Sequence, residues 1–311
     1  MATTFFADIN LAMNPPVKRA AYSDRTAWLM AEFSKLVYEP FPSNKGEASI
    51  IDTALGKIGF QVLEYWDADG TQAMLIRRDA RDGVEGMLVL VFRGTQLKEA
   101  RDVMVDINLR LTGFPGGGRV HAGFLNGFTR VEQSVKAALE KYNDAGRLPL
   151  YITGHSLGGA LALIATRAFD ADNCGATYTF GCPRTADEAF FEPIKTPVYR
   201  IVNAGDGVAR MPLGYSLAIA MSILRLIPFN GTFWLSKWVL GHVSGYAHYG
   251  SLIFISGADD SVKVRMSPDI FWQAPFVVLR WAATLGKALL SDHGMDEYRQ
   301  KLMTYAKKRS G

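Results

Sequence analysis

The pentapeptide Gly154-His155-Ser156-Leu157-Gly158 constrains the fold of this chain more than any other segment. It follows Leu150-Tyr-Ile-Thr153, which is typical of a buried strand, and precedes an apolar run at 160–166, which is typical of a buried helix. Glycines at this spacing let the strand and helix backbones come close together, and the tight turn exposes the serine hydroxyl. The segment therefore predicts a strand–turn–helix unit with Ser156 as a nucleophile.

The serine motif alone is weak evidence for catalysis, because a chain with 30 glycines can contain Gly-x-Ser-x-Gly by chance. The same segment fits a plain glycine-rich turn in which Ser156 only caps the following helix. A serine hydroxyl becomes a good nucleophile only next to a base, which an acid must orient. The catalytic interpretation therefore depends on a histidine and a carboxylate elsewhere in the chain.

The composition restricts the class of protein. The chain has 311 residues, of which 49% are hydrophobic and 21% charged, as expected for a globular protein with a large apolar core. The net charge is +4, but Lys and Arg are scattered, which argues against a nucleic-acid partner. The two cysteines, Cys174 and Cys182, lack metal-ligand spacing, and we expect no metal and no cofactor.

Strand and helix patterns alternate along most of the chain, which predicts an α/β fold with a doubly wound, mostly parallel sheet and helices on both faces. No internal repeat or domain boundary is visible, so we expect a single domain over residues 1–311. The expected strands are 58–65, 73–78, 87–92, 149–153, 176–181, 198–203, 251–256 and 261–266, and the expected helices are 24–38, 121–142, 159–170, 275–290 and 295–308.

Two segments depart from this alternation. Residues 1–20 have mixed polarity and contain Asn-Pro-Pro, which predicts an N-terminal arm, and residues 213–244 are rich in Trp, Phe and Leu, which predicts an apolar insertion. We find no basic region followed by an apolar core at the N-terminus, and no uncharged stretch of the roughly 20 residues that span a bilayer. We expect a cytoplasmic protein or the mature form of a secreted one.

Asp206 is the predicted acid. It follows the apolar pattern of residues 198–203, which places its carboxylate on a loop at the carboxyl end of a strand, where catalytic groups gather in α/β sheets. It also lies after Ser156, in the chain order Ser, Asp, His that hydrolases of this type use. A solvated turn aspartate is the structural alternative.

The base must be chosen from His242, His248 and His293, which follow Asp206. His248 precedes the expected strand 251–256, so it would lie at the wrong edge of the sheet if that strand is parallel, whereas an antiparallel strand would weaken the argument. His293 lies after the last strands, on a loop leading into the final helix, and we predict that it is the base. His121 and His155 are expected to be structural.

Acyl transfer also needs donors for the tetrahedral oxyanion. One is the backbone N–H after the nucleophile, here that of Leu157, and the other comes from a loop after an earlier strand. That loop is Phe92-Arg-Gly-Thr-Gln96, in which Thr95 can supply a backbone N–H and a hydroxyl. Thr95 and Leu157 are the predicted oxyanion hole, although Thr95 also fits an ordinary strand-ending turn.

Several segments together resemble the class 3 lipases, the fungal-type lipase family of the α/β hydrolases. They occur in family order over most of the chain: Val91-Phe-Arg-Gly-Thr95, Val120-His-Ala-Gly-Phe124, Thr153-Gly-His-Ser-Leu-Gly-Gly159, Phe180-Gly-Cys-Pro-Arg184 and Arg200-Ile-Val-Asn203 through Asp206 and Pro212. The resemblance implies the same nucleophile, acid and oxyanion residues. Gly245-Tyr-Ala-His248 resembles a family block whose histidine is not the base, which again favours His293.

The chain also departs from the family pattern. The separation between Asp206 and His293 is too long unless residues 213–244 are an insertion. Residues 96–113 match the family's lid, but Val103 stands where Trp is usual. We therefore expect residues 213–244 either to share the covering role and contact lipid, or to form a buried helical pair that enlarges the core.

These features predict a serine carboxylic-ester hydrolase, namely a monomeric triacylglycerol lipase that acts through an acyl-enzyme on Ser156 and contacts a lipid interface transiently. A phospholipase A1, a feruloyl esterase or a small-ester esterase with the same triad would look alike. A catalytically silent, lipid-binding hydrolase fold is the alternative from another functional class.

Overall fold

The computed structural model describes residues 3–13, 15, 21–43, 47, 49–81, 83–94, 110–143, 148–169, 174–210, 245–257, 261–266 and 291–310. Several expectations lie outside these residues: the predicted oxyanion residue Thr95, most of the lid-like segment, the apolar insertion at 213–244 and the expected helix at 275–290.

An eight-stranded sheet forms the centre of the molecule. In sheet order, its strands are β1 (Gln61–Ala68), β2 (Thr71–Arg78), β3 (Met87–Phe92), β6 (Leu150–His155), β7 (Cys174–Phe180), β8 (Val198–Asn203), β9 (Ser251–Ser256) and β10 (Lys263–Met266). Neighbouring strands from β3 to β9 pair in parallel. At the two edges β1, β2 and β10 pair antiparallel.

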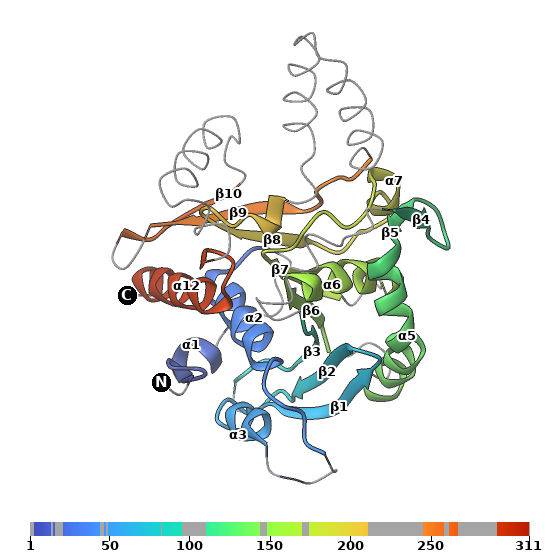
Figure 1. Cartoon of the computed structure of the whole chain (residues 1–311). Helices are drawn as coiled ribbons and strands as arrows, with labels where there is room; N and C mark the ends of the chain where they lie inside the picture. The colour runs from blue at the N-terminus through green and yellow to red at the C-terminus, as the bar shows by residue number, and fades with distance from the viewer. Residues whose placement is uncertain are drawn as a thin grey trace.

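Helices cover both faces of this sheet (Figure 1). The helical elements are α1 (Ile9–Met13), α2 (Asp24–Leu36), α3 (Ile50–Gly56), α5 (Ala122–Tyr142), α6 (Leu157–Ala168), α7 (Glu188–Phe191), the 3-10 turn η2 (Val208–Arg210) and α12 (Met295–Ser310). A small separate hairpin consists of β4 (Leu111–Gly113) and β5 (Arg119–His121).

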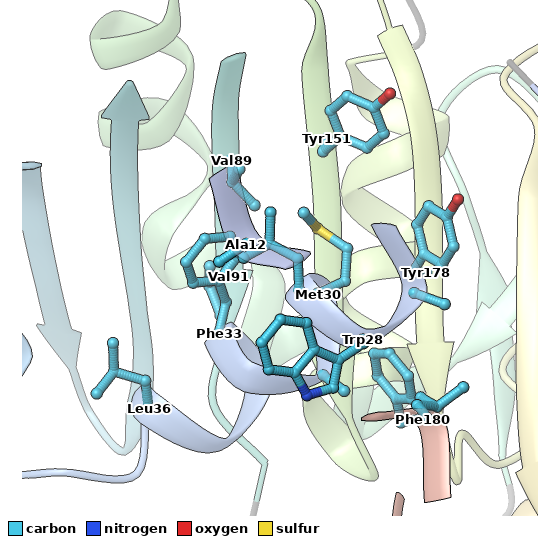
Figure 2. Packing of buried hydrophobic residues seen from close by; sticks show 14 of the residues in the cluster. Ala12, Trp28, Met30, Phe33, Leu36, Val89, Val91, Tyr151, Tyr178 and Phe180 are labelled. Carbon is cyan, nitrogen blue, oxygen red and sulfur yellow. The ribbon is translucent and has the colours of Figure 1, made fainter. Parts of the chain in front are cut away.

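Helices α2 and α12 lie against each other on one face, so the two ends of the chain meet there (Figure 1). Trp28, Met30 and Phe33 of α2 are fully buried and pack in one cluster with Val89 and Val91 of β3 (Figure 2). Burying large side chains of this kind stabilises the fold by roughly 1.5–3 kcal/mol each. This packing fixes the position of α2 over the central strands.

Helices α5 and α6 cover the opposite face. Leu88 and Leu90 of β3 belong to that cluster, whereas Met87, Val89 and Val91 belong to the cluster of α2. Because successive side chains of a strand point to opposite faces, a strand buried on both sides needs an unbroken apolar run. This explains why β3 consists of apolar residues without a polar break.

The predicted mostly parallel sheet with helices on both faces is confirmed. Each expected strand has a counterpart, with ends shifted by a few residues. The short elements α1, α3, α7 and the β4–β5 hairpin were not predicted, because they are too short to show a periodicity and depend on tertiary contacts. Among the described residues, none of the helices combines the length and apolarity needed to cross a bilayer.

Candidate active site

Ser156 occupies a strained turn between β6 and α6. Its backbone has φ 55° and ψ −125°, in a region that residues with a side chain rarely adopt. The N–H of Ser156 donates to the carbonyl oxygen of Phe180 at 2.9 Å, and the Ser156 hydroxyl makes no capping bond to α6. The side chain is therefore not occupied as a helix cap, and strain of this kind persists where function needs it.

Gly154 explains how the turn can be so tight. A Cβ atom built on Gly154 would lie 2.3 Å from the carbonyl oxygen of Gly158, which is closer than non-bonded atoms approach. The strand and the first turn of α6 are therefore in backbone contact at this point. The sequence predicted this close approach from the two glycines that flank Ser156.

Asp206 lies at the carboxyl end of β8 and is completely buried. Its Oδ1 accepts the backbone N–H groups of Val208 at 2.9 Å and Ala209 at 3.3 Å. Its Oδ2 accepts the hydroxyl of Tyr298 at 2.5 Å. Nδ1 of His293 lies 3.0 Å from both oxygens. A buried carboxylate is tolerated only with such partners, and these donors hold its charge and its orientation.

His293 presents its other ring nitrogen as a free acceptor. Because Nδ1 donates to Asp206, the neutral imidazole has its lone pair on Nε2. Nε2 is buried and has no hydrogen-bond partner among the described residues. A general base requires a basic nitrogen that is free to accept a proton, on a ring that a carboxylate orients, and His293 meets both conditions.

The loop that carries His293 is bound directly to the loop that carries the acid. Asn203 Nδ2 donates to the carbonyl of Asp292 at 2.8 Å, and the N–H of Gly205 donates to Asp292 Oδ2 at 2.9 Å. The N–H of Asn203 donates to the Tyr298 hydroxyl at 3.0 Å, and that hydroxyl in turn donates to the acid. Residues far apart in sequence thus fix the distance between acid and base.

Gly181 packs directly against this pair. It has φ +56°, and a Cβ atom at this position would lie 2.7 Å from Asp206 Oδ2 and 2.8 Å from His293 Nδ1. Only glycine fits both the backbone conformation and the space. Since Gly181 follows Phe180, whose carbonyl binds the N–H of Ser156, it also places the pair next to the serine turn.

The structure separates His248 from the acid. Strand β9 is parallel to β8, and His248 precedes Ser251, which pairs with Tyr199 near the start of β8. Asp206 follows Asn203 at the other end of β8. Burial, and then three nearby arginines, lowers the pKa of His248 well below its usual range. The structure therefore brings Asp206 together with His293 and leaves His248 at the opposite edge.

The two remaining histidines among the described residues have structural contacts, as expected. His121 caps α5, because its Nδ1 accepts the N–H of Phe124 at 3.2 Å, and burial lowers its pKa to about 4. His155 Nε2 lies 2.7 Å from the carbonyl of His293, and its Nδ1 lies 3.0 Å from the hydroxyl of Tyr38.

One of the two predicted oxyanion donors falls in the described part of the chain. Leu157 is the first residue of α6, so its N–H lies in the first turn of the helix, which has no intrahelical acceptors. A cavity of about 430 Å³ is lined by Leu157 and by Gly94, the residue before Thr95. Neither Ser156 nor His293 is among the residues that line this cavity.

Two residues of this site could not be found from the sequence. Tyr298 looks like an ordinary apolar position of the last helix, and Gly181 looks like a turn glycine. The only available signal for Gly181 was its place in a segment that resembles the family. In the described part of the chain, no group of three or more His, Cys, Asp or Glu side chains is arranged to hold a metal ion.

Comparisons with known proteins agree with the geometry. Residues 89–216 match the family model described as Lipase (class 3). A lipase from Rhizomucor miehei is 31% identical over 154 residues, which cover 46% of this chain and 41% of the relative. Phospholipase A(1) DAD1, chloroplastic, from Arabidopsis thaliana is 30% identical over 150 residues, which cover 40% of this chain and 33% of the relative. The match thus spans less than half of each relative.

The fold also matches solved structures. The lipase from Rhizopus microsporus var. chinensis is 22% identical, with a TM-score of 0.58 over 90% of this chain and 91% of that one. A parallel sheet, a strained serine between strand and helix, and a buried acid–histidine pair on later loops occur here together with the family match. Residues 89–216, which are less than half of the chain, therefore match the class 3 lipase family, and the chain has the α/β-hydrolase fold.

Proposed function

We propose that this protein is a serine carboxylic-ester hydrolase that acts on lipid esters, with Ser156 as nucleophile, His293 as base and Asp206 as acid. The observation that carries the proposal is the buried carboxylate–imidazole pair, 3.0 Å apart, whose Nε2 has no hydrogen-bond partner among the described residues. The carbonyl of His293 lies 2.7 Å from Nε2 of His155, the residue before the strained serine. A protein that only bound lipid would have no need of a buried acid–base pair.

In the proposed first step, Nε2 of His293 removes the hydroxyl proton of Ser156 while Oγ forms a bond to the ester carbonyl carbon. The carbonyl oxygen becomes an oxyanion, which the N–H groups of Leu157 and Thr95 stabilise. Asp206 holds the imidazole in the required tautomer and stabilises the imidazolium. The imidazolium then returns its proton to the leaving alcohol, and an acyl-serine remains.

In the second step, His293 takes a proton from water, whose oxygen bonds to the acyl carbon. The second tetrahedral oxyanion collapses, the bond to Ser156 Oγ breaks, and the proton returns to the serine. The products are a free carboxylic acid and the original enzyme. Every step uses groups of this chain and water.

We propose triacylglycerols as the preferred substrates, as the resemblance to the class 3 lipases implies, and a relative from Rhizomucor miehei is named a lipase. The relative named phospholipase A(1) makes phospholipids the second candidate. Hydrolysis should be measured for a chain-length series of triacylglycerols, p-nitrophenyl esters and phosphatidylcholine, below and above their solubility limits. We expect the highest rates on emulsified triacylglycerols, whereas a preference for phosphatidylcholine or for dissolved short esters would contradict this assignment.

The Tyr298 hydroxyl gives a second prediction. Tyr298→Phe removes one donor from the Asp206 carboxylate and preserves the ring in the core. A hydrogen bond to a charged acceptor contributes about 1.5–3 kcal/mol, so we expect kcat to fall roughly 10- to 100-fold. Tyr305→Phe in the same helix is the matched control and should retain wild-type activity. An unchanged kcat in Tyr298→Phe would show that this donor does not support the acid.

Gly181 gives a third prediction. In Gly181→Ala the new methyl group would overlap both Asp206 and His293, so we expect the pair to separate and kcat/KM to fall by more than about 100-fold. Gly83→Ala is the matched control, because Gly83 has φ +79° and nothing within 4 Å of the new Cβ. Its strain should cost roughly 1–2 kcal/mol of stability and no activity. Equal activity in both variants would contradict the close packing.

We also propose that the chain acts as one domain and as a monomer. The described helices pack on the faces of one continuous sheet, which supports a single domain. Contact with a lipid surface through residues 213–244 stays a prediction, and deletion of that segment should lower activity on emulsified long-chain esters.

A further inference from the structure

A chain of contacts runs from Gly94, the residue before the predicted oxyanion residue, to the loop of the base. A Cβ atom built on Gly94 would lie 2.5 Å from the Tyr38 hydroxyl, so these two residues are in direct contact. The Tyr38 hydroxyl lies 3.0 Å from His155 Nδ1, and His155 Nε2 lies 2.7 Å from the carbonyl oxygen of His293. The chain passes directly beneath the serine turn, because His155 precedes Ser156.

When His155 is neutral, each of its two hydrogen bonds has one direction. The carbonyl of His293 can only accept, so His155 Nε2 must donate. In a neutral imidazole the other nitrogen is then an acceptor, so Nδ1 accepts the proton of the Tyr38 hydroxyl. Both hydrogen bonds of His155 are made when its ring is neutral and has its proton on Nε2.

The surroundings of His155 support this state. Burial, and then the adjacent His293 imidazole, lower the pKa of His155 to about 3. The two rings have centroids 4.5 Å apart and planes tilted by 34°. The titratable groups that face His155 are His293, Asp206, Lys35, Tyr38 and Tyr298. A neutral His155 adds no second positive charge beside His293 when that ring takes the serine proton.

Tyr38 itself is held firmly. The guanidinium carbon of Arg93 lies 5.5 Å from the centroid of its ring, in a cation–π arrangement. A Cβ atom on Gly94 would lie 2.5 Å from the Tyr38 hydroxyl and 2.3 Å from the His155 carbonyl. Gly94, Tyr38 and His155 are therefore packed directly against one another.

We propose that Tyr38 and His155 are positioning residues, which hold the oxyanion loop and the base loop at a fixed separation across Ser156. This inference rests on the proposed ester hydrolysis. Neither residue touches the reacting atoms: Tyr38 acts on the backbone of the oxyanion loop, and His155 acts on the backbone and ring of the base. Both loops contribute more to the transition state than to substrate binding, so their misplacement should reduce kcat and leave KM nearly constant.

Kinetics of matched variants test this proposal. Tyr38→Phe leaves the buried Nδ1 of His155 without a donor, and we expect kcat to fall about tenfold with KM within about twofold. In His155→Phe we expect a larger fall in kcat than in Tyr38→Phe. In His155→Gln we expect a smaller fall than in His155→Phe, because the glutamine amide can still donate to the His293 carbonyl. Tyr65→Phe, which removes a phenol hydroxyl that lies 3.5 Å from a carboxylate oxygen of exposed Asp52, is the control with wild-type kinetics. Wild-type kcat in Tyr38→Phe would overturn the proposal.

A spectroscopic measurement separates this proposal from the proposed function. Nitrogen chemical shifts of ¹⁵N-histidine in the wild-type protein should show His155 as the neutral Nε2–H tautomer between about pH 5 and pH 8. Tyr38→Phe should perturb that signal. A titrating His155, or an Nδ1–H tautomer, would overturn the chain of hydrogen bonds even if the protein hydrolyses esters. If the wild-type protein shows no esterase activity while the tautomer is as expected, the proposed function fails and the hydrogen-bonded arrangement of Tyr38, His155 and His293 stands.

Discussion

Ser156→Ala is expected to lower kcat/KM for ester hydrolysis by roughly 10⁴- to 10⁶-fold. The substitution removes only Oγ, and that hydroxyl makes no capping hydrogen bond to α6. The backbone already accommodates a Cβ atom at φ 55°, so the stability and the fold should remain unchanged. The fall in kcat/KM would therefore reflect the loss of the nucleophile and not a change in folding. It should be measured on the best substrate of the ester series, with thermal unfolding of both proteins as the control.

Retention of activity in Ser156→Ala would contradict the assignment of the nucleophile. Background hydrolysis by a contaminating esterase is the main source of error, because the expected residual activity is very small. Mock purifications from cells that lack the gene for this protein measure that background. An activity in Ser156→Ala that exceeds the background by more than about a hundredth of the wild-type value would be too large for a residual active site.

His293→Ala should reduce kcat/KM by a similar factor, because the serine then has no base. His248→Ala is the matched variant and should retain activity within about tenfold of the wild type. His248 lies at the opposite edge of the sheet and is kept neutral by burial and three arginines, which lower its pKa. Equal losses in both variants would contradict the choice of base.

The sequence predicted those parts of the site that depend on local patterns. A strand pattern, two glycines and a helix pattern around Ser156 define the turn, and the strand before Asp206 places the acid at the correct edge. The choice between His248 and His293 needed one assumption about strand direction. The structure supports it, since β9 is parallel to β8.

The supporting residues could not be predicted, because their roles depend on contacts between distant segments. Tyr298 reaches the acid across 92 positions, and Tyr38 reaches His155 across 117 positions. No periodicity encodes such pairs, since they follow from how α2 and α12 pack over the sheet. Gly181 is another example. A side chain at this position would overlap Asp206 and His293, which can be seen only when the positions of both residues are known.

Labelling with a fluorophosphonate probe tests the central claim most directly. An activated serine displaces fluoride and forms a covalent bond to phosphorus, whereas an unactivated serine does not. Mass spectrometry of the digested protein should show one adduct per chain, on the peptide that contains Ser156, and no adduct in His293→Ala. A folded wild-type protein that remains unlabelled, or that carries the adduct on another residue, would contradict the proposed catalytic triad.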